Sequence, residues 1–200
     1  MTDTDNRTLT YYNQNSQSFT GTTLDVEFSE IQDTFLSYLK EGAYILDFGC
    51  GSGRDTRYFL KKGYRVDAID GSEEMVRIAS ENTGIEVKHM LFQELNETGK
   101  YDGIFACASI LHVKREELPD ILNRMYKALK NEGVIYVSFK YGTFEGERNG
   151  RYFTDMNEER FESLMREVPV MEVLEETITS DVRPGRADEK WLNVFLRKPE

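Results

Sequence analysis

The chain has 200 residues, of which 39% are hydrophobic and 30% are charged, and these proportions are ordinary for a soluble globular protein of one domain. Its 25 basic and 36 acidic residues give a formal net charge of −11, which repels phosphate backbones and argues against DNA or RNA as a partner. No apolar run approaches the ~20 residues that a membrane-spanning helix needs. The N-terminal segment MTDTDNRTLT lacks the basic end and the apolar core of a signal peptide.

The cysteines and histidines point to a reducing compartment and to no metal site. Two cysteines, Cys50 and Cys107, cannot form a disulfide framework, so we expect a cytoplasmic protein. They form no C-x-x-C pair, which argues against redox work. The two histidines, His89 and His112, do not have a metal-binding spacing, so no metal ion is expected. The sequence does not indicate the oligomeric state.

The N-terminal segment is polar at first and then aromatic. We expect residues 1–8 to fray. In the run 9–19, the rings of Tyr11, Tyr12 and Phe19 can lie on one side of a short helix. That helix either only covers the core or closes as a lid over bound ligands.

A second helix and the start of a βαβ unit follow. Apolar residues recur at steps of three and four between positions 24 and 40, which predicts an amphipathic helix that Gly42 ends. A strand at 43–48 and a helix at 54–62 are joined by a turn with glycine at positions 49, 51 and 53. Glycine suits this turn because a positive φ and a close ligand both exclude a Cβ atom. Backbone N–H groups at the helix start can then approach a ligand.

A carboxylate ends each of the first two strands. Asp47 comes two residues before the first glycine, and Asp70 ends a second predicted strand at 64–70, a separation of 70 − 47 = 23 residues. At the tip of the second strand, a carboxylate can accept hydrogen bonds from ribose hydroxyls. The glycine spacing is G-x-G-x-G, which differs from the G-x-G-x-x-G of dinucleotide binders.

Strands and helices continue to alternate after Asp70. Ser72 can cap the next helix. The remaining elements are predicted as strands at 85–91, 101–108 and 134–140, with Gly133 at the turn into the last, and a helix at 115–129. This alternation predicts a parallel sheet with helices on both faces. Two late strand-like runs, 168–179 and 190–197, have no helix between them, so they are expected to pair antiparallel at one edge.

Four motifs of the chain resemble those of class I S-adenosylmethionine-dependent methyltransferases, in the same order. LDFGCGSG resembles the glycine-rich first motif of the family, and AIDGS resembles its second-strand motif. YDGIFACASILHV resembles the fourth-strand motif, and LKNEGVIYVSFK resembles the fifth strand. Together, GSGRD, IDGS, ACASILHV and SFKYG most resemble the small-molecule, tellurite-resistance-like branch. One glycine loop would be weak evidence, whereas four ordered motifs across residues 44–140 are specific.

The resemblance implies that the chain binds S-adenosyl-L-methionine through residues at the strand ends. The glycine loop would pass under the methionine moiety, Asp47 or Arg54 would meet its amino-acid end, and Asp70 would hold the ribose hydroxyls. The other implied contacts come from Gly49, Cys50, Gly51 and Gly53 in the loop, from Ile69 and Gly71 beside the sugar, from Leu91 and Phe92 at the adenine edge, and from the backbone of Ala106 near the methionine amino group. The acidic residue that often holds the adenine amino group near position 91 is missing here.

Methyl transfer from a sulfonium is an in-line displacement, so the residues near the acceptor mainly orient it. His112 follows the fourth strand and is either a general base or a hydrogen-bonding spacer. Aromatic faces can stabilise the sulfonium, and the candidates are Tyr11, Tyr12 and Tyr141.

The glycine-rich, charged segment at 140–153 is expected to form a mobile loop across the pocket mouth. We expect Arg151, which stands beside two aromatic residues, to bind an anionic acceptor. Arg148 is expected to lie in solvent and pair with Glu145 and Glu147.

These observations predict an α/β fold, a Rossmann-like three-layer sandwich. Its mostly parallel seven-stranded sheet would have an antiparallel edge strand and helices on both faces. The single domain would comprise a helical cap (1–40), a cofactor-binding core (43–140) and an acceptor-side region (141–200) with a loop, a helix and edge strands.

The predicted function is transfer of a methyl group from S-adenosyl-L-methionine to a small-molecule acceptor that can be anionic. A regulatory domain that binds the cofactor without turnover and a nicotinamide-dependent oxidoreductase are the alternatives. A basic peptide tail is a further possible acceptor, because the protein is acidic.

Overall fold

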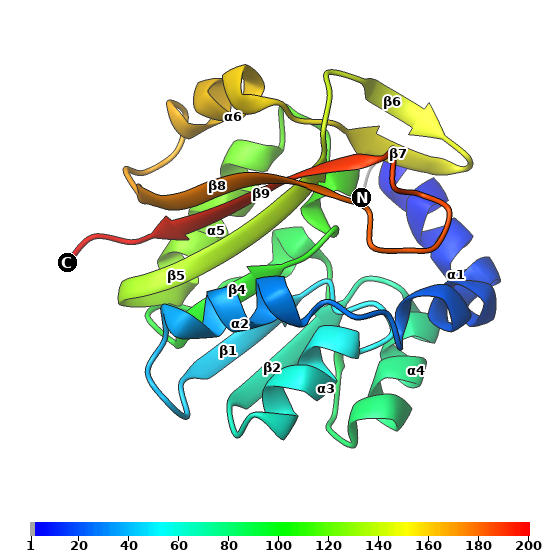
Figure 1. Cartoon of the computed structure of the whole chain (residues 1–200), viewed down its shortest axis with the longest axis horizontal. Helices are drawn as coiled ribbons and strands as arrows, with labels where there is room; N and C mark the ends of the chain where they lie inside the picture. Colours follow the sequence, from blue (N-terminus) through cyan, green and yellow to red (C-terminus); the bar gives the residue numbers. More distant parts are fainter. Residues whose placement is uncertain (1–2) are drawn as a thin grey trace.

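A seven-stranded β-sheet crosses the middle of the molecule, with helices on both faces (Figure 1). The computed structural model describes residues 3–200, with side chains from residue 7 onward. In their order across the sheet, the strands are β3 (Lys88–His89), β2 (Arg65–Asp70), β1 (Tyr44–Phe48), β4 (Tyr101–Ala106), β5 (Leu129–Lys140), β9 (Lys190–Arg197) and β8 (Glu172–Ser180).

The strand directions place a ligand-binding point between β1 and β4. Strands β1 to β5 are parallel, whereas β9 is antiparallel to both of its neighbours, β5 and β8. The chain moves outward from β1 to β2 and β3, and then returns to place β4 on the other side of β1. Open α/β sheets bind ligands beyond the carboxyl ends of the strands where the order reverses in this way.

On one face of the sheet lie α2 (Ser29–Ser37) and α3 (Arg54–Lys61), whose aromatic residues Phe35 and Phe59 pack against Phe105 of β4. Beside α3, the helix α4 (Glu73–Thr83) packs Ala79 against Ala68 of β2. These apolar contacts fix the turns after β1 and β2, from which the helices start.

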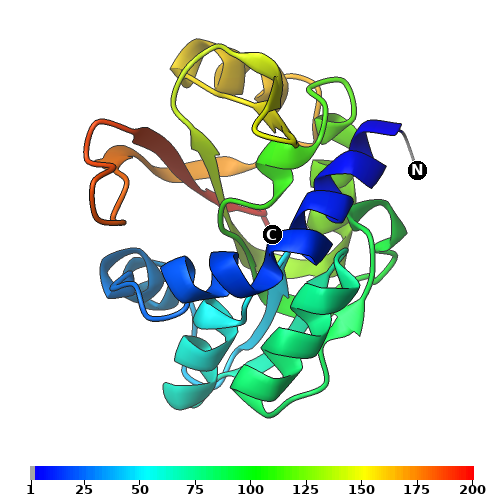
Figure 2. The same cartoon turned by 90° about the vertical axis from the view of Figure 1, so that its right-hand side faces the viewer.

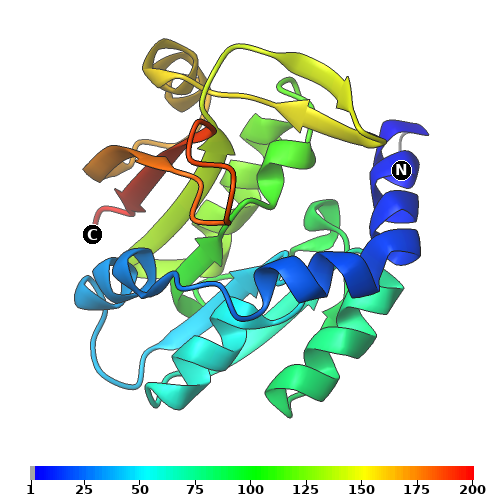
Figure 3. The same cartoon turned by 45° about the vertical axis from the view of Figure 1, so that its right-hand side comes forward.

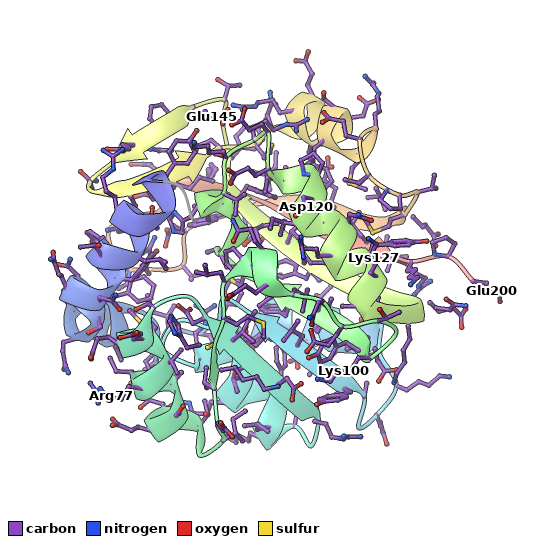
Figure 4. The ribbon with its side chains drawn as sticks, turned by 180° about the vertical axis from the view of Figure 1, so that it is seen from behind. Arg77, Lys100, Asp120, Lys127, Glu145 and Glu200 are labelled. Atoms are coloured by element: carbon purple, nitrogen blue, oxygen red, sulfur yellow. The ribbon has the colours of Figure 1, made fainter. Side chains whose placement is uncertain are left out.

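The opposite face is covered by α5 (Leu118–Ala128) and α6 (Glu158–Met165), which contribute Ile121 and Phe161 to the larger apolar cluster. The outer side of α5 is charged, and Figure 4 shows Asp120 and Lys127 on it. Two short 3-10 helices, η1 (Phe92–Glu94) and η2 (Ile110–His112), follow β3 and β4.

Two elements stand outside these layers at the carboxyl ends of the strands. The long helix α1 (Asp3–Thr23) lies along this edge, as Figure 2 shows. It contacts α4 and a hairpin formed by β6 (Glu145–Arg148) and β7 (Arg151–Thr154).

The predicted fold class is confirmed, and so is the antiparallel pairing of the last two strands. The reversed strand is β9, with β8 outside it at the edge. Several boundaries differ: α1 includes residues 3–8, which were expected to fray, and residues 1 and 2 lie outside the described part. The second helix covers only Ser29–Ser37, and the third strand only Lys88–His89.

Two predictions of irregular structure are wrong. β5 begins at Leu129, its pairing with β4 shifts register between Leu129 and Val134, and the left-handed residue in this irregular stretch is Glu132, with a φ of 61°, and not Gly133. A Cβ atom at position 133 would lie 2.9 Å from the Lys130 carbonyl oxygen, so tight packing within the strand accounts for the glycine. The segment 140–153 is not an open loop, because most of it forms the β6–β7 hairpin.

Candidate active site

A cavity of about 400 Å³ lies at the carboxyl ends of the strands. Its walls are α1, the glycine-rich turn after β1, the segments after β2, β3 and β4, the β6–β7 hairpin and the turn between β8 and β9. Figure 3 shows these elements from one side, with α1 opposite the β8–β9 turn. Volumes of about 300–1,000 Å³ are typical of small-ligand sites.

The glycine-rich turn is fastened to the end of β2. The Gly49 and Cys50 amides donate to the Ile69 carbonyl at 3.0 and 2.9 Å, and the Gly51 amide donates to Asp70 Oδ2 at 2.9 Å. Gly49 has a φ of 85°, and a Cβ atom there would lie 2.5 Å from Ser109 Cβ. A side chain at this position is therefore excluded by both backbone conformation and packing.

Asp70 faces the cavity with both carboxylate oxygens held by the backbone. Oδ2 accepts from the Gly51 amide and Oδ1 from the Ser72 amide, each at 2.9 Å. Burial raises the pKa of Asp70 above its usual value, although these two hydrogen bonds lower it. Each oxygen can accept one more hydrogen bond, so the group can bind a pair of neighbouring hydroxyls.

Leu91, Phe92 and Gln93 form an apolar end of the cavity with one amide group. Gly71 lies against it, and a Cβ atom there would lie 2.9 Å from Leu9 Cδ2 and 3.2 Å from Leu91 Cδ2. Gln93 was missed in the sequence, although it stands two residues after Leu91, where an acidic residue was sought. Its carboxamide both donates and accepts, as the edge of a nucleobase requires.

Four predicted cofactor contacts lie behind the cavity wall instead of facing it: Asp47, Gly53, Ile69 and Ala106. Asp47 is 2% exposed and accepts from Thr56 Oγ1 at 2.6 Å. Ile69 and Ala106 are core residues. Gly53 is the N-cap of α3, and a Cβ atom there would lie 2.7 Å from Thr83 Cγ2. The predicted direct contact of these four residues with the cofactor is therefore corrected: they support the cavity wall from behind.

Arg54, the alternative to Asp47, does face the cavity. Its guanidinium donates to both carboxylate oxygens of Asp55, at 3.0 and 2.9 Å, and stacks on Phe28 at 4.3 Å. Gln32 donates to the same carboxylate at 2.6 Å. Burial and then the neighbouring Asp55 raise the pKa of Asp47, behind this pair, to about 8.

One side of α1 lines the cavity along its length, so the helix does more than cover the core. The lining positions on α1 are Thr8, Leu9, Tyr11, Tyr12, Asn15, Ser18, Phe19, Thr22 and Thr23. These follow the steps of three and four residues expected for one helix face. Ser72 donates to Asn13 at 2.7 Å and so ties α1 to the start of α4.

Tyr12 and His112 form a hydrogen-bonded pair in the cavity wall. His112 Nδ1 lies 2.6 Å from the Tyr152 carbonyl oxygen, so Nδ1 carries the proton and Nε2 accepts from the Tyr12 hydroxyl at 2.8 Å. Burial lowers the pKa of His112 to about 4, and the nearby Arg151 charge contributes in the same direction. The imidazole is therefore neutral at pH 7, with its lone pair occupied.

Arg151 lies in the same wall, surrounded by aromatic rings. Its guanidinium carbon is 4.5 Å from the Tyr11 ring centre and 5.1 Å from that of Phe153. Its Nε is buried and makes no hydrogen bond. Among the side chains of residues 7–200, Arg151 forms no ion pair with a carboxylate.

Two other candidates near the hairpin face elsewhere. Tyr141 donates to Glu158 at 2.8 Å and does not line the cavity, so its predicted place beside the sulfonium is wrong. Arg148 pairs with Asp155, and not with Glu145 and Glu147. In total, twelve of the predicted site residues line the cavity: Tyr11, Tyr12, Gly49, Cys50, Gly51, Arg54, Asp70, Gly71, Leu91, Phe92, His112 and Arg151.

The edge strands were expected on the acceptor side (141–200), but apart from Lys140 the residues of the wall formed by β5, β9, β8 and the β8–β9 turn were not named. Lys140, Arg183, Arg186, Trp191 and Asn193 line it. The sequence contained one usable signal, the basic turn RPGR between the last two strands. Among the side chains of residues 7–200, no group of three or more His, Cys, Asp and Glu is arranged to bind a metal ion. No helix in the part of the chain that the structure describes is long and apolar enough to span a membrane.

Comparisons with known proteins find methyltransferases. Residues 45–133 match the methyltransferase domain family. An uncharacterised methyltransferase of Staphylococcus carnosus is 30% identical over 124 residues, which cover 58% of this chain and 59% of that protein. The Haemophilus influenzae protein named "probable S-adenosyl-L-methionine-dependent methyltransferase TehB" is 29% identical over 86 residues, covering 40% of this chain and 30% of its own length.

A solved structure matches almost the whole chain. The 1,6-didemethyltoxoflavin-N1-methyltransferase of Burkholderia thailandensis, crystallised with 1,6-didemethyltoxoflavin and S-adenosylhomocysteine, has a TM-score of 0.80. At 20% identity, covering 98% of this chain and 89% of that one, the likeness is one of fold. The chain spans 59%, 46% and 47% of the lengths of three bacterial relatives.

Proposed function

The chain carries a methyltransferase domain of the class I S-adenosylmethionine-dependent family, and from this premise we propose that it methylates a small-molecule acceptor with an anionic group. The observation that carries the proposal is the cavity at the strand ends, where Asp70 faces the space between the glycine-rich turn and Leu91. Residues 1–40 would act as the cap, 43–140 as the cofactor-binding core and 141–200 as the acceptor side. The free thiols of Cys50 and Cys107 support a cytoplasmic location.

The residues at the donor end fit an adenosyl group. Asp70 has acceptor capacity for two ribose hydroxyls, and Leu91 and Phe92 offer apolar surface to a ring beside the Gln93 amide. When bound, S-adenosyl-L-methionine supplies an electrophilic methyl group on a positive sulfonium. The Tyr11 and Tyr12 rings would stabilise positive charge near the middle of the cavity.

His112 would act by positioning Tyr12. Its Nε2 already accepts from the Tyr12 hydroxyl, and a pKa of about 4 makes it a weak base at neutral pH. Fixing Tyr12 also fixes α1 against β7, because Tyr152 of β7 provides the carbonyl that holds the imidazole and its amide donates to Thr8 at 3.1 Å. An acceptor whose nucleophile is already unprotonated needs no general base in this site.

The acceptor half of the cavity is the part formed by the β6–β7 hairpin, β5, β9 and the β8–β9 turn, and its charge supports an anionic acceptor. Four cationic residues line it: Lys140, Arg151, Arg183 and Arg186. Asp181 and Glu189 pair with three of them, which leaves a local excess of 4 − 2 = 2 positive charges in a chain of net charge −11. Among the side chains of residues 7–200, Arg151 is the one of these four cations that has no carboxylate partner, so an acceptor oxyanion would pair with it.

Calorimetric titration with S-adenosyl-L-methionine and separately with NADH tests the cofactor. We expect micromolar binding of S-adenosyl-L-methionine and no binding of NADH, because this chain lacks the G-x-G-x-x-G spacing that nicotinamide dinucleotide binders have. Release of S-adenosylhomocysteine is then measured with a panel of phenolic, amine and thiol acids and their neutral amides. Cofactor binding without turnover on any of these would favour the regulatory alternative, and binding of NADH alone would overturn the proposal.

A further inference from the structure

The turn between β8 and β9, residues 181–189, forms one side of the acceptor half. Because β8 is antiparallel to β9 and β9 is antiparallel to β5, β8 runs in the direction of β5 and ends at the same edge of the sheet. The turn therefore lies beside the carboxyl ends of β1, β2 and β4, opposite α1 (Figure 3). Three of its side chains that line the cavity are Asp181, Val182 and Arg183.

The Asp181 carboxylate uses its hydrogen-bonding capacity within this turn and with Trp191. Its carboxylate accepts from the Arg183 amide and from Arg183 Nε, each at 2.9 Å, from Arg183 Nη2, and from Trp191 Nε1 at 3.1 Å. Burial raises the pKa of Asp181, but these hydrogen bonds and the Arg183 charge outweigh burial and lower it to about 2. The ionised Asp181 thus fixes Arg183 and Trp191 in one orientation and has little capacity left for a ligand.

Arg183 has N–H donors that Asp181 does not use and that a ligand could accept from. A guanidinium has five N–H bonds, and Asp181 takes one from Nε and one from Nη2. The Arg183 side chain forms no further hydrogen bond with the described backbone or with the side chains of residues 7–200, and it is 21% exposed along the cavity. Asp181 and, more weakly, Tyr12 on the other side of the cavity raise the pKa of Arg183, so Tyr12 lies within electrostatic reach of this guanidinium.

Arg151 donates from Nη1 to the Tyr12 hydroxyl at 3.4 Å, and its buried Nε has no partner among the described residues, so it gives the acceptor half a second guanidinium with donors to spare. It stands on β7, against Tyr11 and Phe153, and its charge acts on Tyr12 as well. The Trp191 ring, with Lys140 Nζ at 5.1 Å from its centre, adds a flat apolar surface to the same wall of the cavity as Arg183. Two oriented guanidiniums and flat aromatic surfaces suit an oxyanion on a planar, apolar body.

We infer that Arg183, braced by Asp181, and Arg151 together bind a carboxylate or similar oxyanion of a planar acceptor, so that the β8–β9 turn selects the acceptor. This inference rests on the proposed function. Arg183 would contact the acceptor, whereas Asp181 is a positioning residue that acts through Arg183. The amino-acid end of S-adenosyl-L-methionine also carries a carboxylate, so the test must separate these two sources of the anion.

The test compares benzoate with benzamide, which share a planar ring and differ in charge. Each is titrated calorimetrically into the protein saturated with S-adenosylhomocysteine. We expect the wild type to bind benzoate about tenfold or more tightly than benzamide, as charge-assisted hydrogen bonds predict. Arg183→Gln should abolish the preference, Asp181→Asn should reduce it, and Arg183→Lys should retain part of it.

The control is Arg166→Gln, which removes an arginine that is 71% exposed at the C-terminal end of α6, outside the cavity, and should leave the preference unchanged. S-adenosylhomocysteine and 5′-methylthioadenosine, which lacks the carboxylate, are titrated into each variant as well. If Arg183→Gln weakens only the first, the anion is that of the cofactor and the inference is overturned. The inference is also overturned if the wild type does not prefer benzoate to benzamide. In that case the proposed function still stands, provided that the wild type binds S-adenosylhomocysteine.

Discussion

Replacing Asp70 tests the donor site at one carboxylate. Its oxygens accept from the Gly51 and Ser72 amides at 2.9 Å each, which leaves one further acceptor position per oxygen for the ribose hydroxyls. A hydrogen bond to a charged group contributes about 1.5–3 kcal/mol. Asp70→Asn replaces one oxygen by an NH₂ group and should cost about 2 kcal/mol of binding, or about 30-fold in Kd. Asp70→Ala loses both bonds and should cost about 4 kcal/mol, or about a thousandfold.

The assay is calorimetric titration with S-adenosylhomocysteine, together with thermal unfolding without ligand. Asp33→Asn is the control, because Asp33 is an exposed carboxylate on α2 that binds Tyr58 and Lys62 outside the cavity. It should leave the affinity unchanged. Equal affinity of wild type, Asp70→Asn and Asp70→Ala would refute the assignment of Asp70 to the ribose.

Three other predictions concern the acceptor half and the buried titratable groups. Arg151→Ala should raise the acceptor KM about tenfold or more and leave S-adenosylhomocysteine affinity unchanged, because the cation lies among acceptor-side residues; steady-state kinetics with calorimetry checks this, and the reverse pattern would assign Arg151 to the donor. The pKa of His112 is lowered from 6.5 to about 4, so between these pH values the unfolded chain binds a proton that the folded chain does not. The free energy of unfolding therefore falls by up to about 3 kcal/mol as pH falls through that window. In urea unfolding, His112→Asn should lose this part of the acid dependence, and parallel curves for both proteins would contradict the account. The pKa of Asp47 is raised to about 8, so the folded state holds a proton that the unfolded chain loses near pH 4, and stability falls as pH rises through 4–8. Asp47→Asn should therefore gain stability relative to wild type between pH 6 and pH 9, and a constant difference would count against it.

Local patterns were sufficient to predict the βα units and the donor end of the cavity. The glycines at 49, 51 and 53 require positive φ, and all three have it in the structure. Asp70 comes last in β2, and the end of a parallel strand lies at the functional edge wherever the strand packs. Ser72 is the N-cap of α4 and accepts from the Met75 amide, as its residue type predicted.

The direction of a side chain depends on packing that these patterns do not contain. Asp47 also lies near the end of its strand, at the functional edge of the sheet. However, it shares a face of β1 with Ile45, and α3 covers that face, so the Asp47 carboxylate accepts a hydrogen bond from Thr56. Strand alternation would have revealed this, because Leu46 and Phe48 belong to the opposite cluster.

The acceptor side depends on contacts between distant segments. Arg183 reaches the cavity only because β9 inserts between β5 and β8 and so sets the direction of β8. The pairing of Tyr12 with His112 joins residues 100 positions apart, and no local pattern predicts it. Gly133 looked like a turn residue, whereas its role is the close approach of Lys130 within β5.

The most direct test of the account is a crystal structure of the protein with S-adenosylhomocysteine. We expect the ribose hydroxyls on the Asp70 carboxylate, the adenine beside Leu91, Phe92 and Gln93, and the amino-acid end toward Arg54 and the glycine-rich turn. A nucleoside bound outside this cavity, or bound within it without contact to Asp70, would contradict the account.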